Sequence, residues 1–155
     1  MNDNCLFCKI AAGAIPSAKV YEDDKVLAFL DIAPVEKGHT LVISKRLHSE
    51  ALIETPDDVL AELFAVARKV GAAMMKAGFG GFNVVQNNYP DGGQAIPHIH
   101  LHVIPREKGR TGPLAWASGS HPYADDAERA TYAARLRAAL AQEGRASSRP
   151  KGAEG

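Results

Sequence analysis

Residues 94–105 carry the clearest alternation of polar and apolar positions in the chain. Three histidines, His98, His100 and His102, each precede an aliphatic residue. A period of two predicts a β-strand with one face in the core. Because successive side chains of a strand point to opposite faces, the three imidazoles share one face. We therefore expect this strand to carry the functional face of the molecule.

Four further strands are expected from shorter alternating or apolar runs. Turn residues separate them, among them Asp23, Asp24 and Gly38. Short connections usually join antiparallel neighbours. The sequence therefore predicts a five-stranded antiparallel sheet. The strands before the histidine strand are expected at residues 19–22, 25–32, 39–44 and 82–87.

Three helices complete the predicted α+β fold. A short helix is expected over residues 4–12 with Asn4 as N-cap. The main helix begins after the N-cap Thr55 and extends to about Lys76. Its apolar residues recur at intervals of three and four, which predicts a stripe covering the sheet face opposite the histidines. This stripe consists of Leu60, Leu63, Phe64, Ala67, Val70, Gly71 and Met74. A C-terminal helix is expected over residues 125–142.

Length and charge narrow the class of protein. The 155 residues suit one domain, expected over residues 1–143, and the polar residues 144–155 are expected to be disordered. Eighteen basic residues balance 18 acidic ones, which argues against binding to nucleic acid or to an anionic membrane. No apolar run is long enough to cross a bilayer, and residues 1–4 do not resemble a signal peptide. We therefore expect a cytoplasmic protein.

Three interpretations of the histidine run are possible. The plainest is a strand whose polar face happens to be rich in histidine. The second is a metal centre, since a His-x-His pair needs only one more ligand to hold zinc. The third is nucleophilic, because neutral imidazole attacks phosphorus when its other nitrogen is held by an acceptor and neighbouring histidines donate to the phosphate. No carboxylate lies on this face, which favours the nucleophilic interpretation.

Cys5 and Cys8 are the only cysteines, and their C-x-x-C spacing supplies half of a zinc site. His48 and His98 are the candidates for the two missing ligands. Idle thiols are one alternative. A redox pair is another, but no thioredoxin-like βαβ pattern follows the cysteines.

The residues around the three histidines resemble those of a known family. His98-Ile-His100-Leu-His102-Val-Ile resembles the signature of the histidine triad superfamily, in which three histidines alternate with apolar residues. Asp91-Gly92-Gly93-Gln94 is similar to the loop of the Hint branch, the nucleoside phosphoramidases. Residues 5–48 resemble the N-terminal half of the family, so the likeness covers about residues 4–106.

The resemblance implies a role for each catalytic candidate. His100 would be the nucleophile that forms a covalent phosphohistidine. His102 would bind phosphate oxygens and assist the leaving group, with His39 beside it as a fourth histidine. Asn87 stands where the family places an amide that contacts the phosphate or the leaving group.

The resemblance also implies a nucleotide pocket. Asp31 would hold the ribose hydroxyls, as a carboxylate accepts from both members of a diol. Gln94 and the amide of Ile96 would face the phosphate. Ala95 departs from the Ser or Thr that is common in the family. The implied base pocket consists of Leu6, Phe7, Ile10, Phe29 and Ile32.

Zinc and a partner chain follow from the same resemblance. Bacterial members pair a C-x-x-C with histidines at corresponding positions, which implies a structural Zn²⁺ on Cys5, Cys8, His48 and His98. The family also implies a homodimer that joins two sheets into one surface. Trp116 would anchor the C-terminal part on the dimer or near the partner's active site, or would simply pack.

The implied reaction is hydrolysis or transfer at the α-phosphorus of a purine nucleotide. The Asp91–Gln94 loop favours a nucleoside phosphoramidase that releases AMP or GMP. The alternative is a dinucleoside polyphosphate hydrolase. Pro105-Arg106 after the triad resembles the sequence of that branch, where a basic residue could contact the additional phosphates. A zinc hydrolase and a non-enzymatic nucleotide-binding regulator are the remaining classes.

Overall fold

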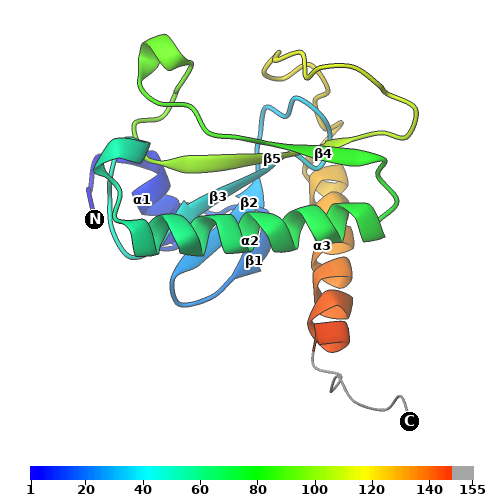
Figure 1. Ribbon diagram of the computed structural model, residues 1–155, viewed down its shortest axis with the longest axis horizontal. Coiled ribbons are helices and arrows are strands. Elements are labelled where there is room, and N and C mark those ends of the chain that lie inside the picture. Colours follow the sequence, from blue (N-terminus) through cyan, green and yellow to red (C-terminus); the bar gives the residue numbers. More distant parts are fainter. Residues whose placement is uncertain (148–155) are drawn as a thin grey trace.

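The computed structural model describes residues 1–147 and contains a five-stranded antiparallel sheet (Figure 1). The strand order is β1-β2-β3-β5-β4, so the histidine strand β5 lies between β3 and the edge strand β4. This architecture confirms the predicted α+β fold. The strands are β1 Lys19–Glu22, β2 Val26–Leu30, β3 Thr40–Ser44, β4 Gly81–Val85 and β5 His100–Arg106.

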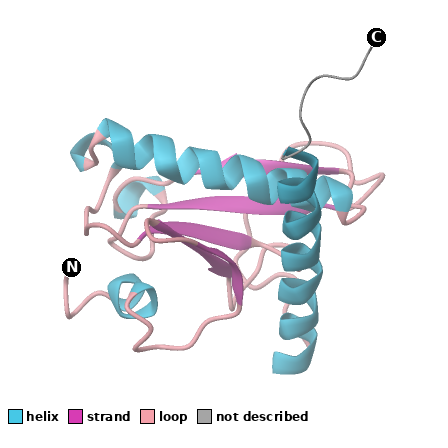
Figure 2. Ribbon diagram, turned by 90° about the horizontal axis from the view of Figure 1, so that it is seen from below, coloured by secondary structure: helices cyan, strands magenta, loops and turns pink. Residues whose placement is uncertain are grey.

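Helices lie on both faces of the sheet (Figure 2). The long helix α2 lies along one face, the short helix α1 lies on the other, and α3 packs against α2 and β1. Among residues 1–147, no helix combines the length and the apolar character that crossing a membrane requires. The helices are α1 Leu6–Ala11, α2 Asp57–Lys76 and α3 Asp126–Ser147, with 3-10 turns η1 Leu52–Glu54 and η2 Pro90–Gly92.

Helix α2 covers the sheet face opposite the catalytic histidine candidates, as predicted. Leu101 and Val103 of β5 point to this face and belong to the same buried cluster as Leu63, Val70 and Met74. Burial of such aliphatic side chains contributes roughly 1.5–3 kcal/mol each. Phe64 is the exception in the predicted stripe, because 48% of its surface is exposed.

The other face of the sheet continues the row of histidines. Antiparallel pairing places His102 opposite Leu41, and Leu41 opposite Phe29. His100 is likewise opposite Ile43. Residues directly opposite in a sheet share a face, so the histidines stand beside an apolar floor. The N-terminal helix α1 packs on this floor through residues such as Phe7.

Both predicted N-caps are wrong. Helix α1 begins after Cys5, whose Sγ accepts the backbone N–H of Cys8 at 3.4 Å, so a sulfur replaces the expected Asn4 oxygen. Helix α2 is preceded by Pro56. The hydroxyl of Thr55 instead donates to Ala51 O at 2.8 Å and lies 2.7 Å from Ser49 Oγ.

Several element ends also differ from the prediction. His98 lies in a bend before β5, where its N–H donates to Ile96 O at 2.8 Å. β4 ends at Val85 and leaves Asn87 in the following loop. Helix α3 continues to Ser147, past the expected end at residue 142, so residues 144–147 of the expected tail are helical. The remainder of that tail, 148–155, lies outside the described residues.

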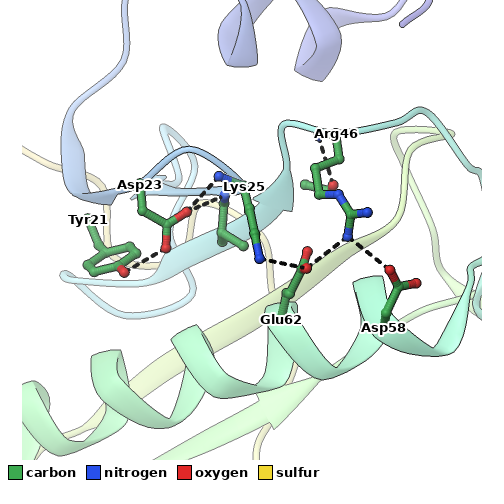
Figure 3. A network of polar contacts seen from close by, with 8 residues as sticks. Tyr21, Asp23, Lys25, Arg46, Asp58 and Glu62 are labelled. Carbon is green, nitrogen blue, oxygen red and sulfur yellow. Dashed lines mark hydrogen bonds and ion pairs between the residues drawn. The ribbon is translucent and has the colours of Figure 1, made fainter.

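A network of charged side chains holds α2 against the strands (Figure 3). Arg46, just after β3, donates to Glu62 at 2.8 Å and to Asp58 at 3.1 Å. Lys25 lies 3.6 Å from the same Glu62 oxygen. Asp23 accepts from the backbone N–H of Lys25 at 2.7 Å and thereby closes the β1–β2 turn. The network links the turn, the end of β3 and the start of α2.

Candidate active site and metal centre

The hydrogen bonds of His100 leave one ring nitrogen free as a nucleophile. Its Nδ1 lies 2.6 Å from the carbonyl oxygen of His98. A carbonyl only accepts, so Nδ1 carries the proton and Nε2 keeps its lone pair. Burial lowers the pKa of His100, which keeps the ring neutral at pH 7. The ring of Phe7 packs against it edge to face at 5.0 Å. The arrangement suits attack by Nε2 on an electrophile.

His39 and His102 form a second hydrogen-bonded unit with a defined direction. The backbone N–H of Val35 donates to Nδ1 of His39 at 3.1 Å, so the proton of neutral His39 is on Nε2. This Nε2 lies 2.9 Å from Nδ1 of His102 and donates to it. The proton of His102 is therefore on its own Nε2. Burial lowers the pKa of His39 to about 4 and that of His102 to about 3, so both are neutral at pH 7.

The proximity of Asp31 makes a second metal cluster conceivable, but the hydrogen bonds oppose it. Oδ2 of Asp31 lies 3.8 Å from Nε2 of His39, and the ligand atoms of Asp31, His39 and His102 lie within 4.8 Å of one another. A metal on Nε2 of His39 would need the lone pair there, and its proton would then face the N–H of Val35. The hydrogen bond from His39 to His102 uses this Nε2 proton, while the Asp31 carboxylate lies beside it without forming a hydrogen bond to it. The other oxygen of Asp31 accepts from the N–H of Ala33 at 2.9 Å.

A cavity of about 470 Å³ opens beside these histidines. Its wall is mostly apolar and includes residues from α1, β2 and the 93–96 loop. Seven of the eight residues predicted to bind the nucleotide line it, although Ile32 is 78% exposed. These seven are Leu6, Phe7, Ile10, Phe29, Asp31, Ile32 and Ile96. His100 and His102 lie in the same wall, so the cavity joins an apolar end to the histidines.

Gln94 and Asn87 do not line the cavity. The side chain of Gln94 accepts from the N–H of Tyr89 at 2.7 Å and donates to Glu50 O at 2.7 Å. It thereby holds Tyr89, whose φ of 63° is uncommon for a residue with a side chain. A Cβ on Gly93 would lie 3.9 Å from the Asn87 amide, so Asn87 stands just behind the glycine that lines the cavity.

The structure also brings in residues that the sequence interpretation missed. Trp116, Ser118 and Arg129 line the cavity from the segment after β5 and from α3. Ile15 and Leu41 also belong to its apolar part. No local spacing connects any of them with the histidines. Their place depends on how the C-terminal third of the chain docks.

Four predicted metal ligands converge on one point. Nδ1 of His98 lies 3.4 Å from Sγ of Cys5 and 3.5 Å from Sγ of Cys8, and Nδ1 of His48 lies 3.3 Å from Sγ of Cys8. A tetrahedral zinc with Zn–S of about 2.3 Å and Zn–N of about 2.0 Å places sulfur and nitrogen ligands roughly 3.5 Å apart. All four ligand atoms lie within 4.8 Å of one another. The cluster is therefore compatible with a closed zinc site.

Burial adds a chemical argument for a cation at this cluster. Cys5, Cys8 and His98 are buried. Burial raises the pKa of the Cys8 thiol, and a bound cation would favour the thiolate instead. Nε2 of His98 is buried without a hydrogen-bond partner, so Nδ1 is the only ring nitrogen with contacts, and all of them are to sulfur.

Comparison with known proteins identifies the family. The sequence profile of the HIT domain matches residues 12–109. The chain belongs to the HIT family. It is 40% identical over 116 residues to adenosine 5'-monophosphoramidase hnt1 of Schizosaccharomyces pombe, covering 74% of this chain and 84% of that protein. It is 41% identical over 121 residues to adenylylsulfatase HINT3 of Arabidopsis thaliana, covering 77% and 59% respectively.

A solved structure supports the fold of this HIT protein over nearly its whole length. A Zn-bound histidine triad family protein from Mycobacterium smegmatis superposes with a TM-score of 0.82 at 36% identity. The match covers 92% of this chain and 97% of that one. The family expected from the His98–His102 signature is thus confirmed.

Proposed function

We propose that this HIT protein hydrolyses purine nucleotides at the α-phosphorus, with His100 as the nucleophile. The proposal depends on one observation: the neutral rings of His100 and His102 carry their protons on different nitrogens. His100 offers a lone pair on Nε2, whereas His102 offers a proton on Nε2. Their ring centroids are 4.7 Å apart and both rings line the cavity, where we expect both nitrogens to meet one phosphate.

The reaction proceeds in two steps. In the first, Nε2 of His100 forms a bond to phosphorus while the bond from phosphorus to the leaving group breaks. His102 donates a hydrogen bond to the phosphate or to the departing atom, and the leaving group takes up a proton from water. In the second, water attacks phosphorus and loses a proton to the solvent, the electron pair of the breaking N–P bond returns to Nε2 of His100, and a nucleoside monophosphate leaves. Asn87 would act indirectly, by supporting Gly93, which lines the cavity.

The cavity supports a nucleotide as the substrate. Its apolar end, between α1 and β2, has the character of a base site. Asp31 lies in the same wall, and its Oδ2, which has no hydrogen bond within residues 1–147, would accept from the ribose hydroxyls. The names of the two enzyme relatives, an adenosine monophosphoramidase and an adenylylsulfatase, agree with an adenine nucleotide and favour an enzyme over a non-enzymatic regulator.

A phosphoramidase is favoured over a dinucleoside polyphosphate hydrolase by the position of Arg106. This residue lies at the end of β5 remote from His100. Its guanidinium donates to Asn83 Oδ1 at 2.9 Å and to Gly112 O at 3.5 Å. Arg106 is thus engaged away from the cavity and is not available to extra phosphates.

One experiment separates these activities. The protein is incubated with adenosine phosphoramidate and, separately, with diadenosine tetraphosphate, and release of AMP is followed. We expect faster release from the phosphoramidate and its loss in His100→Asn. Turnover of neither substrate would refute the hydrolase, and full turnover by His100→Asn would refute the nucleophile.

Zinc and a second chain complete the proposed state of the protein. Cys5, Cys8, His48 and His98 would hold a structural zinc that fastens α1 to the start of β5 and leaves His100 free. The proposed homodimer would form along β4, an edge strand with a single hydrogen-bonded neighbour within residues 1–147. Four exposed apolar side chains lie on β4 and α2, namely Phe64, Met75, Phe82 and Val84.

A further inference from the structure

Residues 110–123, here named the strap, run from the end of β5 towards α3 as an irregular segment (yellow to gold in Figure 1). The strap docks on residues 33–38, which precede β3. Arg110 forms an ion pair with Glu36. The N–H of Gly119 donates to Ala33 O at 2.9 Å. These contacts attach both halves of the strap to the same short stretch of chain.

Two side chains of the strap are attached to Val35. Ser120 Oγ donates to the carbonyl oxygen of Val35 at 3.0 Å, and Nδ1 of His121 donates to the same oxygen at 2.7 Å. Val35 is also the residue whose N–H donates to Nδ1 of His39. The strap therefore holds the residue that decides which nitrogen of His39 carries the proton.

The strap also touches the two catalytic-site rings directly. Trp116 packs edge to face on His102 with ring centroids 4.7 Å apart and on His39 at 5.8 Å. Such aromatic pairs have a preferred geometry, so they fix the orientation of a ring as well as excluding water from it. Trp116 remains 43% exposed, which makes it an outer wall of the site rather than a core residue.

We propose that the strap positions His102 for the reaction, with Ser120 and His121 acting through Val35 and His39, and Trp116 acting on the rings. The proposal rests on the proposed function, since it assigns a purpose to the Nε2 proton of His102. Trp116, Ser120 and His121 are positioning residues in this scheme.

Loosening the strap would allow the ring proton to change nitrogen in both His39 and His102. If Val35 no longer donates to His39, the proton of His39 can move from Nε2 to Nδ1. Nε2 of His39 then accepts, and His102 responds by carrying its proton on Nδ1. The total number of protons is unchanged, but His102 now presents a lone pair to the phosphate where it presented a donor. His100 and His102 then both present a lone pair to the phosphate, although no residue of the site has been replaced.

The test compares a Trp116→Ala variant and a Ser120→Ala/His121→Ala double variant with the wild-type protein. Nitrogen-15 NMR of the histidine rings reports which nitrogen is protonated, and steady-state kinetics with adenosine phosphoramidate reports kcat and KM. Thr111→Ala is the matched control, because its exposed side chain lies in the strap and makes none of these contacts. Trp116→Phe retains an aromatic ring and should restore the wild-type behaviour.

We expect His102 to become a mixture of the two protonated forms in the double variant and its ring to lose its fixed orientation in Trp116→Ala, with kcat about tenfold lower in both and KM within about twofold of the wild type. The proposal is overturned if His102 keeps its proton on Nε2 in the double variant, even if kcat falls, or if Trp116→Ala keeps the wild-type kcat. Should Trp116→Ala not fold, the double variant and Trp116→Phe still decide. The NMR result is independent of turnover, so a wild-type protein that hydrolyses nothing would refute the proposed function separately.

Discussion

His39, which directly precedes β3, donates its Nε2 proton to Nδ1 of His102 on β5 across 2.9 Å, and Val35 fixes the direction of this hydrogen bond. The backbone N–H of Val35 allows only one neutral form of His39. That form requires His102 to accept on Nδ1 and to donate on Nε2. His39 therefore acts on the proposed reaction without lining the cavity.

Replacing His39 tests this relationship. We expect His39→Ala to lower kcat roughly 10-fold to 100-fold, because His102 loses the group that orients it and fixes its proton. The affinity for AMP should change less than about threefold, since the apolar wall of the cavity is untouched. Kinetics and calorimetric titration with AMP measure the two quantities. His39→Gln, which keeps a donor, should recover part of the activity, and an unchanged kcat in His39→Ala would contradict the scheme.

His39 and His102 also make the free energy of unfolding depend on pH. An unfolded histidine takes up a proton near pH 6.5, whereas folded His39 and His102 do so only near their lowered pKa values of about 4 and about 3. The unfolded state thus binds more protons below pH 6.5, and the free energy of unfolding falls as the pH is lowered towards 4. The loss for His39 alone is on the order of 3 kcal/mol. Urea unfolding at several pH values measures it, and His39→Leu should show a shallower dependence.

The sheet and the histidine face were predictable because local patterns specify them. Alternation placed His100 and His102 on one face, and the stripe of α2 placed the core on the other. The N-cap predictions failed because other local contacts replaced the expected ones. Thr55 illustrates this, since its hydroxyl is engaged by Ala51 and Ser49.

The strap was not predictable, because nothing in residues 110–123 indicates where they dock. Trp116 is the only tryptophan, and the sequence left its role open between anchoring and packing. Its contacts with His39 and His102 arise from tertiary hydrogen bonds to Val35 and its neighbours. The same holds for Arg129, which reaches the cavity from α3.

Removal of the metal ligands tests the zinc site. We expect one zinc per purified chain, and none in Cys8→Ser, which should also unfold at a lower temperature because α1 is no longer fastened. Elemental analysis and thermal unfolding measure these changes. Asp31→Asn is the matched control, since it alters the other possible cluster and should keep one zinc. Loss of zinc in Asp31→Asn, or its retention in Cys8→Ser, would place the metal elsewhere.

The edge strand β4 tests the proposed dimer. Phe82 and Val84, two residues apart on β4, lie on the same side of the strand. The ring of Phe82 lies against Gly71 of α2, so closely that a Cβ added to Gly71 would come within 2.4 Å of the ring. The apolar surface thus continues from the strand onto the helix. An exposed apolar edge of this kind readily pairs with another strand. A second copy of the chain would cover it.

Introducing a charge on this surface should therefore separate the two chains. We expect the wild-type protein to have twice the mass of one chain in light scattering. Val84→Glu and Phe64→Glu should raise the dimer dissociation constant by at least roughly 100-fold, because each buries an unpaired carboxylate in the contact. Ile53→Glu is the control, since Ile53 is an exposed apolar residue of η1 outside this surface. A wild-type monomer, or equal dissociation by the Ile53 variant, would show that β4 is not the contact.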